Sequence, residues 1–391
     1  MGDLRAHSVT ATGKAGERLL HFVLPGEVDD PAAPSGGNTY DRRLCRELPA
    51  AGWQVRPYTV PGSGPEPGPE ARRELARCLA ALPDGALVLL DGLVACGVPE
   101  ITAPEAGRLR MAVLVHLPLA DETGLAPATA RELAARERRT LHAVGAVVAT
   151  SRWAARRLVA QHGLAADRVH VAAPGVDPAP LAPGTDGATR PQLLCVAAVT
   201  PRKGQHRLVE ALATVPELPW TCACVGGARG DSPYMTQLAS KVKQLGLDDR
   251  VRFAGPRAGA ELEAYYAAAD LLVLTSYAET YGMVVTEALA RGIPVLATAV
   301  GGVPEAVGSA PDGRVPGLLV PSDDPAALSG ALRGWLGDPE LRQRLKILAR
   351  GRRATLEGWE MTAHNLAAAL ERLRHEPVRP KPVRHEPGTA G

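Results

Sequence analysis

The segment 271–295, LLVLTSYAETYGMVVTEALARGIPV, carries the most informative pattern of the sequence. The apolar run Leu271–Thr275 predicts a buried strand that ends at Ser276. A polar turn with Gly282 follows, and a helix is expected to run through Glu287. Unpaired backbone N–H groups and the helix dipole favour negative charge at such a helix start. The segment therefore predicts an anion site suited to a diphosphate.

Two glutamates flank this helix start. Glu279 lies in the loop before the helix, and Glu287 lies about a turn and a half into it. Carboxylates accept paired hydroxyl hydrogens, so one is suited to a sugar and the other to a ribose. The alternative is that both are solvated glutamates beside an ordinary helix start.

Short apolar runs alternate with helical patterns on both sides of this segment. The runs before it are Leu19–Leu24, Ala86–Leu90, Met111–Val115, Ala143–Ala149, Val169–Ala172, Gln192–Val199, Trp220–Val225 and Arg250–Ala254, and those after it are Pro294–Ala299 and Gly317–Val320. Apolar strands separated by helices predict parallel sheets covered on both faces. A Pro- and Gly-rich break at 174–191 divides the pattern into two halves. We therefore expect two α/β domains around a cleft, with ligands at the carboxyl ends of the strands.

Composition restricts the function classes. Apolar residues make up 46% of the 391 residues, and the net charge is only +2, so no charged field indicates a nucleic-acid partner. The six cysteines show no zinc pattern and are expected to be free thiols of a cytoplasmic protein. The sequence shows no secretory signal and no run of about 20 apolar residues. Membrane contact is thus expected to be peripheral at most.

Several motifs together resemble one known family. Glu279 and Glu287 have seven residues between them, as in the E-x7-E motif of retaining GT-B glycosyltransferases, particularly family 4. Similar motifs recur in order along the chain: Pro174-Gly-Val-Asp177, Pro201-Arg-Lys-Gly204, Val251-Arg-Phe-Ala-Gly255, Gly292-Ile-Pro-Val295 and Gly301-Gly-Val-Pro-Glu305. The similarity spans most of residues 19–373 and is densest over 170–330.

The resemblance implies a role for each matching residue of the donor site. Glu287 would bind the ribose hydroxyls, and Glu279 would contact the transferred sugar. Lys203 would neutralise the diphosphate leaving group, with Arg202 beside it. The sugar and phosphates would be held by backbone amides of the turn and by glycines, at Gly36, Gly37, Gly255, Thr280, Tyr281, Gly282 and Met283. Tyr281 stands where the family usually has Phe.

One departure from the family concerns the second cation of the donor site. The family usually places a Gly-Arg pair about five residues before the lysine, where this sequence reads Ala197-Ala198. A departing diphosphate is stabilised by preorganised cations. Either Arg202 or Arg257 is therefore expected to replace the missing arginine, and the sequence does not distinguish them.

The N-terminal half supplies the remaining candidates. Gly36-Gly37-Asn38 opens a helix after the first strand, where glycine permits close backbone approach. His116 follows the strand Met111–Val115 and is a candidate catalytic residue, either donating to a sugar hydroxyl or orienting the acceptor. Acceptor-binding candidates are Asn38, His116, Asp121, Glu122 and Arg152. The alternatives are a packed histidine and exposed surface charges.

The expected architecture is GT-B: two Rossmann-like domains facing each other across a cleft. The expected divisions are a disordered N-terminus 1–18, an acceptor domain 19–175, a linker 176–191, a donor domain 192–357, a helix 358–374 crossing back to the N-terminal domain, and a disordered tail 375–391.

The expected reaction transfers a hexosyl group from a UDP- or GDP-sugar to a small polar metabolite or natural-product intermediate. Retention, with no metal and no other cofactor, follows from the resemblance. The alternatives are a nucleotide-sugar 2-epimerase and a non-catalytic sugar-nucleotide binding partner. A homodimer is an open option.

Overall fold

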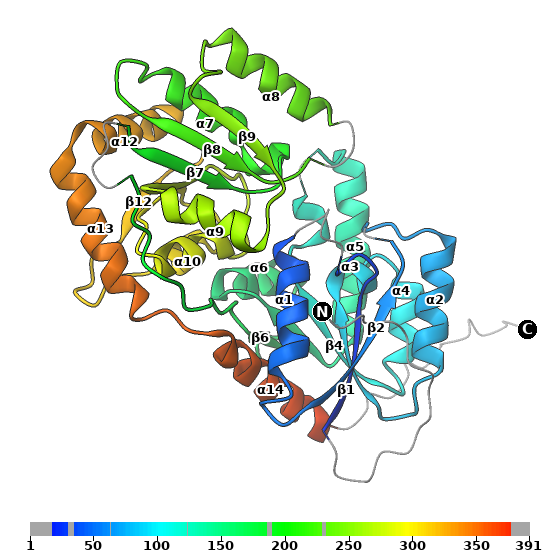
Figure 1. Ribbon diagram of the computed structural model, residues 1–391. Coiled ribbons are helices and arrows are strands. Elements are labelled where there is room, and N and C mark those ends of the chain that lie inside the picture. The colour runs from blue at the N-terminus through cyan, green and yellow to red at the C-terminus, as the bar shows by residue number, and fades with distance from the viewer. Residues whose placement is uncertain are drawn as a thin grey trace, which may run out of the picture.

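The computed structural model describes residues 18–29, 35–62, 64–122, 124–185, 190–228 and 232–376. These residues form two α/β domains, which Figure 1 shows one above the other. Most of the ends predicted as disordered lies outside these ranges. Of the predicted end segments, Arg18 and residues 375–376 are described: Arg18 pairs with Glu371 at 3.2 Å, and His375 is the last residue of a helix.

The N-terminal domain is a parallel sheet with helices on both faces. Its described strands, in the order β2-β1-β3-β4-β5-β6, are β1 (Leu19–Pro25), β2 (Gln54–Val60), β3 (Leu87–Asp91), β4 (Arg110–Val115), β5 (Ala146–Ala149) and β6 (Val169–Val171). Its helices are α1 (Gly36–Glu47), α2 (Pro69–Ala80), α3 (Gly92–Ala95), α4 (Pro99–Glu105), α5 (Pro127–Ala143) and α6 (Arg152–His162). Helices α2 to α6 cover one face, and α1 covers the other with the C-terminal helix α14 (Trp359–His375).

The C-terminal domain repeats this plan. Its described strands, in the order β12-β11-β10-β7-β8-β9, are β7 (Gln192–Val196), β8 (Thr221–Val225), β9 (Val251–Gly255), β10 (Leu271–Leu274), β11 (Val295–Thr298) and β12 (Gly317–Val320). Its helices are α7 (Gln205–Ala213), α8 (Pro233–Gln244), α9 (Gly259–Ala268), α10 (Met283–Ala290), α11 (Val303–Val307), α12 (Pro325–Gly337) and α13 (Pro339–Arg353). Helices α9 to α11 pack on one face and α7, α8 and α12 on the other, while α13 contributes side chains to both cores. None of the helices in the described part of the chain is long and apolar enough to cross a membrane.

Both sheets contain a point where the strand order reverses. In the N-terminal sheet it lies between β1 and β3, and in the C-terminal sheet between β7 and β10. Loops that leave the carboxyl ends of such strands diverge to opposite faces and open a crevice for ligands. The arrangement confirms the expected pair of Rossmann-like domains.

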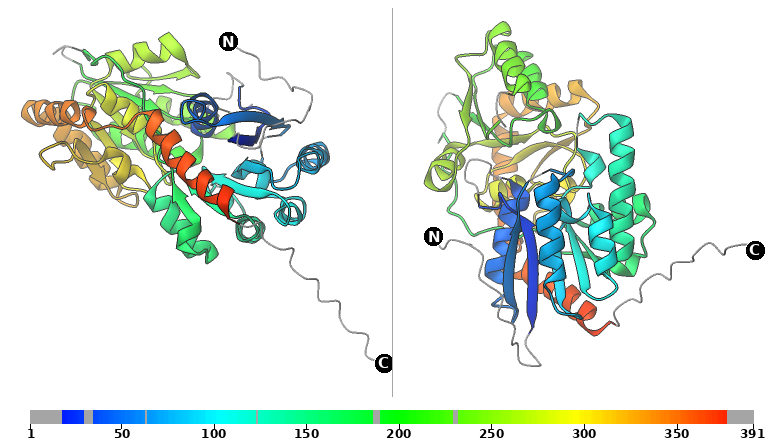
Figure 2. Two further views of the ribbon diagram at one scale, coloured as in Figure 1. Left: turned by 90° about the horizontal axis from the view of Figure 1, so that it is seen from below. Right: turned by 90° about the vertical axis from the view of Figure 1, so that its right-hand side faces the viewer.

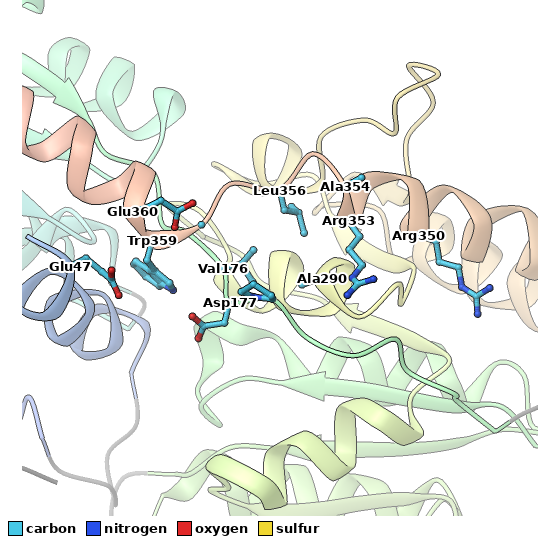
Figure 3. A pocket seen from close by; sticks show the side chains of 12 residues that line it. Glu47, Val176, Asp177, Ala290, Arg350, Arg353, Ala354, Leu356, Trp359 and Glu360 are labelled. Carbon is cyan, nitrogen blue, oxygen red and sulfur yellow. The ribbon is translucent and has the colours of Figure 1, made fainter. Parts of the chain in front are cut away.

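Two connections join the domains at one side of the molecule. The first follows β6, the second leads from α13 to α14, and Val176 N–H donates to the Glu357 carbonyl between them at 3.0 Å. Figure 3 shows the cavity beside these connections, about 450 Å³ in volume, with Trp359 next to Val176. After the second connection, α14 runs back along the N-terminal domain (Figure 2), where Leu366 and Leu370 are fully buried.

The sequence patterns located every strand except β2. β2 is an edge strand with mostly half-exposed residues, and it contains Arg56 and Pro57. A proline without an N–H is tolerated on an edge strand, and partial exposure removes the continuous apolar run that marks the buried strands. The missed strand therefore lacks the signal on which the other predictions rested.

Truncation of Leu366 is expected to test the docking of α14. Leu366→Ala leaves a cavity between α14 and the N-terminal sheet, so the free energy of unfolding should fall by about 2–5 kcal/mol. Met361→Ala, on an exposed part of the same helix, should change it by less than about 0.5 kcal/mol. Urea denaturation followed by tryptophan fluorescence measures both. Equal losses in the two variants would show that α14 is not a core element.

Candidate active site

A cavity of about 360 Å³ lies between the two domains. It is lined from the N-terminal side by loops that follow β1 and β4, and from the C-terminal side by loops that follow β7 and β10. The residues predicted for the site that line it are Gly36, Gly37, His116, Arg202, Lys203, Glu279, Thr280, Tyr281, Gly282, Met283 and Glu287, together with Arg257. The structure thus gathers twelve of the candidates, including both possible second cations, around one cavity.

The loop between β10 and α10 has a fixed shape. The Thr298 hydroxyl donates to the Ser276 carbonyl at 2.6 Å, and Gly302 N–H donates to the Glu279 carbonyl at 3.0 Å. A Cβ on Gly301 would lie 1.7 Å from that carbonyl oxygen, and one on Gly302 would lie 2.1 Å from the Thr280 carbonyl oxygen. Only glycine allows this contact, which explains the Gly-Gly pair of the motif.

Glu279 is buried and ion-paired. Its Oε1 lies 2.5 Å from Lys203 Nζ and accepts a hydrogen bond from the Ser276 hydroxyl at 2.7 Å. Burial opposes ionisation, but the charges of Lys203 and Arg202 outweigh it and lower the pKa of Glu279. The carboxylate is therefore charged at neutral pH, next to the uncapped N-terminus of α10.

Glu287 occupies a different environment on α10. Its Oε2 accepts a hydrogen bond from Tyr266 at 2.6 Å, while Arg291 binds its backbone carbonyl. Burial raises the pKa of Glu287, only partly offset by the Tyr266 hydrogen bond and the Arg291 charge. Such a carboxylate gains most from additional hydroxyl donors.

The two candidates for the second cation differ in their engagement. Arg202 Nε donates to Glu122 Oε1 at 3.2 Å, and its Nη1 donates to the Ala278 carbonyl at 3.1 Å. Arg257 lies 3.5 Å from Glu261 one helical turn along, with 36% of its side chain exposed. Arg202 therefore ties the domains together, whereas Arg257 is the less constrained of the two.

The N-terminal wall contains His116 backed by two buried aspartates. His116 Nε2 lies 2.9 Å from Asp41 Oδ1 and 3.4 Å from Asp91 Oδ2. Burial and the Asp41 charge raise the pKa of Asp91 to about 7. Burial alone would lower the pKa of His116, but Asp41 and Asp91 reverse this and raise it.

These three side chains are also the described group best suited to a metal ion, because their ligand atoms lie within 4.8 Å of one another. Asp41 Oδ2 is buried without a hydrogen-bond partner in the described chain. The pair of carboxylates is balanced by a shared proton or by a cation, and protonated His116 is such a cation.

Five of the predicted residues do not line the cavity. Asn38 donates to the Glu27 carbonyl, Asp121 pairs with Arg157, and Glu122 with Arg202. Gly255 accepts a backbone hydrogen bond from Gly226, and exposed Arg152 presents its backbone N–H to Glu305. Their predicted binding roles have no support from their positions.

Sequence reasoning missed four polar side chains of the site: Asp41, Asp91, Tyr266 and Ser276. Asp91 could have been predicted from the sequence, since it is the last residue of a buried strand, just as His116 follows one. Ser276 stands in the quoted segment, but its bond to Glu279 needs the turn geometry. Asp41 and Tyr266 lie within helices, where nothing in the pattern separates them from other residues.

Comparison with known proteins agrees with this geometry. The model for glycosyl transferases group 1 matches residues 185–352, and that for glycosyltransferase family 4 matches residues 87–180. D-inositol 3-phosphate glycosyltransferases are similar: that of Streptosporangium roseum is 34% identical over 291 residues (68% of this chain, 64% of the relative), and that of Jonesia denitrificans 34% over 271 residues (64% and 63%). The match thus spans less than two thirds of these relatives.

Solved structures show the same fold. Sucrose-phosphate synthase from Thermosynechococcus elongatus has a TM-score of 0.73 at 26% identity, covering 90% of this chain and 98% of that one. HepE from Anabaena in complex with UDP-glucose has a TM-score of 0.71 at 19% identity, covering 90% and 99%. WaaG, a glycosyltransferase involved in lipopolysaccharide biosynthesis, has a TM-score of 0.69 at 20% identity, with the same coverage.

The two sheets and the cavity between their switch points define a two-domain α/β protein with the GT-B fold. The chain belongs to glycosyltransferase family 4, as the resemblance of its motifs implies.

The buried carboxylates of the N-terminal wall are expected to make stability depend on pH. The folded pKa of Asp91, about 7, exceeds the unfolded value of about 3.9. The folded state therefore binds more protons between these values, and the free energy of unfolding falls as pH rises through this window. The raised pKa of His116 acts in the same direction, since its contribution is lost as pH rises through the folded pKa.

Asp91→Asn should flatten this dependence between pH 5 and 8, while an amide oxygen can still accept from Leu93 N–H as Asp91 does at 2.6 Å. Asp167→Asn, an exposed aspartate of the same domain, is the control and should follow the wild type. Urea denaturation at each pH measures the slope. If Asp91→Asn keeps the wild-type slope, the assigned pKa is wrong.

Proposed function

We propose that this protein transfers a hexosyl group from a nucleotide diphosphate sugar, UDP- or GDP-linked, to a small polar acceptor. The observation that carries the proposal is the ion pair of Lys203 with the buried Glu279 beside the N-terminus of α10, inside the interdomain cavity. A cation and free amides suit a diphosphate, and the charged carboxylate suits a sugar ring that becomes electron-poor. The UDP-glucose complex of HepE and the names of the relatives support this reading.

Each residue has a proposed task that follows from its environment. Glu287 binds the ribose hydroxyls, because its side chain lines the cavity and Tyr266 donates to only one of its two carboxylate oxygens. The amides at Gly282 and Met283, where α10 begins, bind the phosphates. Lys203 stabilises the negative charge that develops on the leaving diphosphate, and Glu279 stabilises the electron-poor sugar ring.

We propose retention of configuration by attack on the face from which the diphosphate leaves. The bond from the anomeric carbon to the phosphate oxygen breaks, a bond to the acceptor oxygen forms, and the acceptor proton passes to the leaving phosphate. The proposal needs no metal, since cations and amides stabilise the leaving group. Should a metal be required, Asp41, Asp91 and His116 are the residues in the described chain suited to hold it.

We propose that Arg257 supplies the second cation missing at Ala198. Arg257 and the other candidate, Arg202, both line the cavity. Arg202 is already bound by Glu122 and by a backbone carbonyl, so reaching the diphosphate would cost it two hydrogen bonds. Arg257 would give up only an ion pair at 3.5 Å to a largely exposed partner, which is worth little.

The two alternative functions fit the site less well. A 2-epimerase would want further acid or base carboxylates facing the sugar besides Glu279, whereas Asp41 and Asp91 are 0% and 3% exposed, behind His116. A non-catalytic binding protein would have no need for the paired Lys203 and Glu279. Diphosphate release that increases on adding an acceptor distinguishes transfer from both.

Donor binding is the first test. A donor at about 100 times its Kd should stabilise the protein by about 2.7 kcal/mol, so a thermal-shift screen of UDP-, GDP-, dTDP- and ADP-sugars should reveal one positive group. Glu287→Ala should weaken binding of the free nucleotide at least about tenfold, because a charge-assisted hydrogen bond contributes about 1.5–3 kcal/mol. Glu340→Ala, at an exposed helix start, is the control. Unchanged affinity in folded Glu287→Ala would remove the ribose assignment.

The leaving-group role is tested by kinetics in EDTA. Lys203→Ala should lower kcat by about 10²–10³, the effect of removing one preorganised stabilising group, with a smaller change in donor affinity. Arg257→Ala should lower kcat more than Arg202→Ala does. Normal turnover in Lys203→Ala would contradict the role of Lys203. A larger loss in Arg202→Ala would reverse the assignment of the second cation, and activity that requires added Mg²⁺ or Mn²⁺ would contradict metal independence.

A further inference from the structure

A carboxylate of the C-terminal domain caps a helix of the N-terminal domain. Glu305, at the start of α11, accepts from the backbone N–H of Arg152 through Oε2 at 2.9 Å and from that of Trp153 through Oε1 at 2.6 Å. These are the first two residues of α6, whose N–H groups have no partner within the helix. Arg156 lies 3.7 Å from the same carboxylate. Both oxygens of Glu305 are thus used across the domain boundary.

Thr280 crosses the same boundary beside the cavity. Its hydroxyl donates to the His116 carbonyl at 2.6 Å, and its own carbonyl accepts from the Ser151 hydroxyl at 2.6 Å. Ser151 is the N-cap of α6, where it also accepts from Ala154 N–H at 2.9 Å. The residue next to Glu279 is therefore held between the ends of β4 and β5.

Glu305 and the Glu279–Thr280 loop are joined by close packing within the C-terminal domain. Gly301 and Gly302 pack directly on the carbonyls of Glu279 and Thr280, and α11 begins at the next residue, with Val303 and Ala306 fully buried. The position of Glu305 relative to α6 therefore fixes the position of Thr280 relative to His116.

We propose that Glu305 is a positioning residue: it latches α11 onto α6 and thereby places the Glu279–Thr280 loop against the acceptor wall of the cleft. Glu305 does not line the cavity, so it acts on transfer through Thr280 and not through contact with donor or acceptor. The donor contacts proposed above lie mainly in the C-terminal domain. Loss of the latch should therefore impair turnover and leave nucleotide affinity nearly intact. The expected effect on turnover rests on the proposed transferase function, whereas the latch between α11 and α6 does not.

Glu305→Ala should lower kcat by roughly 10- to 100-fold, the effect of losing one or two charge-assisted hydrogen bonds. Nucleotide affinity, measured by calorimetry, should change by less than about threefold. Glu305→Gln keeps one acceptor oxygen, so its kcat should lie between those of the wild type and Glu305→Ala. Glu340→Ala, again the control, should match the wild type in both measurements.

The N-terminal side of the latch offers a matched pair of variants. Arg152→Pro removes the N–H that Glu305 binds, at the first position of a helix, where proline fits. Ser151 before it has an extended backbone (φ −159°, ψ 163°), which accepts a following proline. Arg152→Ala removes the side chain and keeps the N–H. Turnover should fall further in Arg152→Pro than in Arg152→Ala, because only the proline removes the N–H that Glu305 binds. Combining Arg152→Pro with Glu305→Ala should add less than the sum of the two.

Small-angle scattering separates the latch from the proposed activity. With nucleotide bound, Glu305→Ala and Arg152→Pro should show a larger radius of gyration than the wild type and Arg152→Ala, whether or not the protein transfers sugar. Equal radii would overturn the latch. Expanded variants of an active enzyme that keep full turnover would overturn the positioning role. If the wild type transfers no sugar but the two variants still show a larger radius of gyration, the proposed function is contradicted and the latch is supported.

Discussion

The ion pair between Lys203 and Glu279 is the interaction on which the cleft depends. A carboxylate as deeply buried as Glu279 is costly unless a cation pairs with it, and here the cation comes from the loop after β7 while the acid comes from the loop after β10. The pair forms only when these two strands are neighbours, which the reversal of strand order provides. Gly301 and Gly302 then pack against the backbone carbonyls of Glu279 and Thr280 and hold that loop in place. Local turn geometry, strand order and charge pairing thus specify the same arrangement.

The motif segment of the C-terminal domain could be predicted because its signals are local. An apolar strand, a glycine turn and a helix follow one another between residues 271 and 290, and the structure places β10 and α10 there. Contacts between distant segments had no such signal. Lys203 and Glu279 are 76 residues apart, and only the family resemblance placed them in one site. In the Asp41–His116–Asp91 group, Asp91 and His116 stand at the ends of two predicted strands, but nothing in the sequence indicates that Asp41 of α1 lies beside them.

Glu305 shows a different limit of sequence reasoning. It was visible as the last residue of the Gly-Gly-Val-Pro-Glu motif, and its place near a helix start could be read. Its partners, the first N–H groups of α6, belong to the other domain. Which helix faces which across a cleft depends on two connections and on the docking of α14, none of which is encoded near residue 305. A motif residue can therefore be recognised from sequence while the surface that it binds cannot.

Two buried carboxylates on opposite walls of the cleft show how the site is polarised. Glu279 and Asp91 are both withdrawn from water, yet the pKa of Glu279 is lowered by Lys203 and Arg202 while that of Asp91 is raised to about 7 by burial and by Asp41. The difference lies in the neighbours of each carboxylate: the cations Lys203 and Arg202 lie beside Glu279, whereas the carboxylate of Asp41 lies beside Asp91. The proposed reaction places negative charge on the leaving diphosphate, which also takes the acceptor proton, and Lys203 and Arg202 lie on the side where that charge would grow. The alanines at 197 and 198 weaken the cationic wall at one point, and Arg257 is the side chain whose existing partner is most easily exchanged for a phosphate.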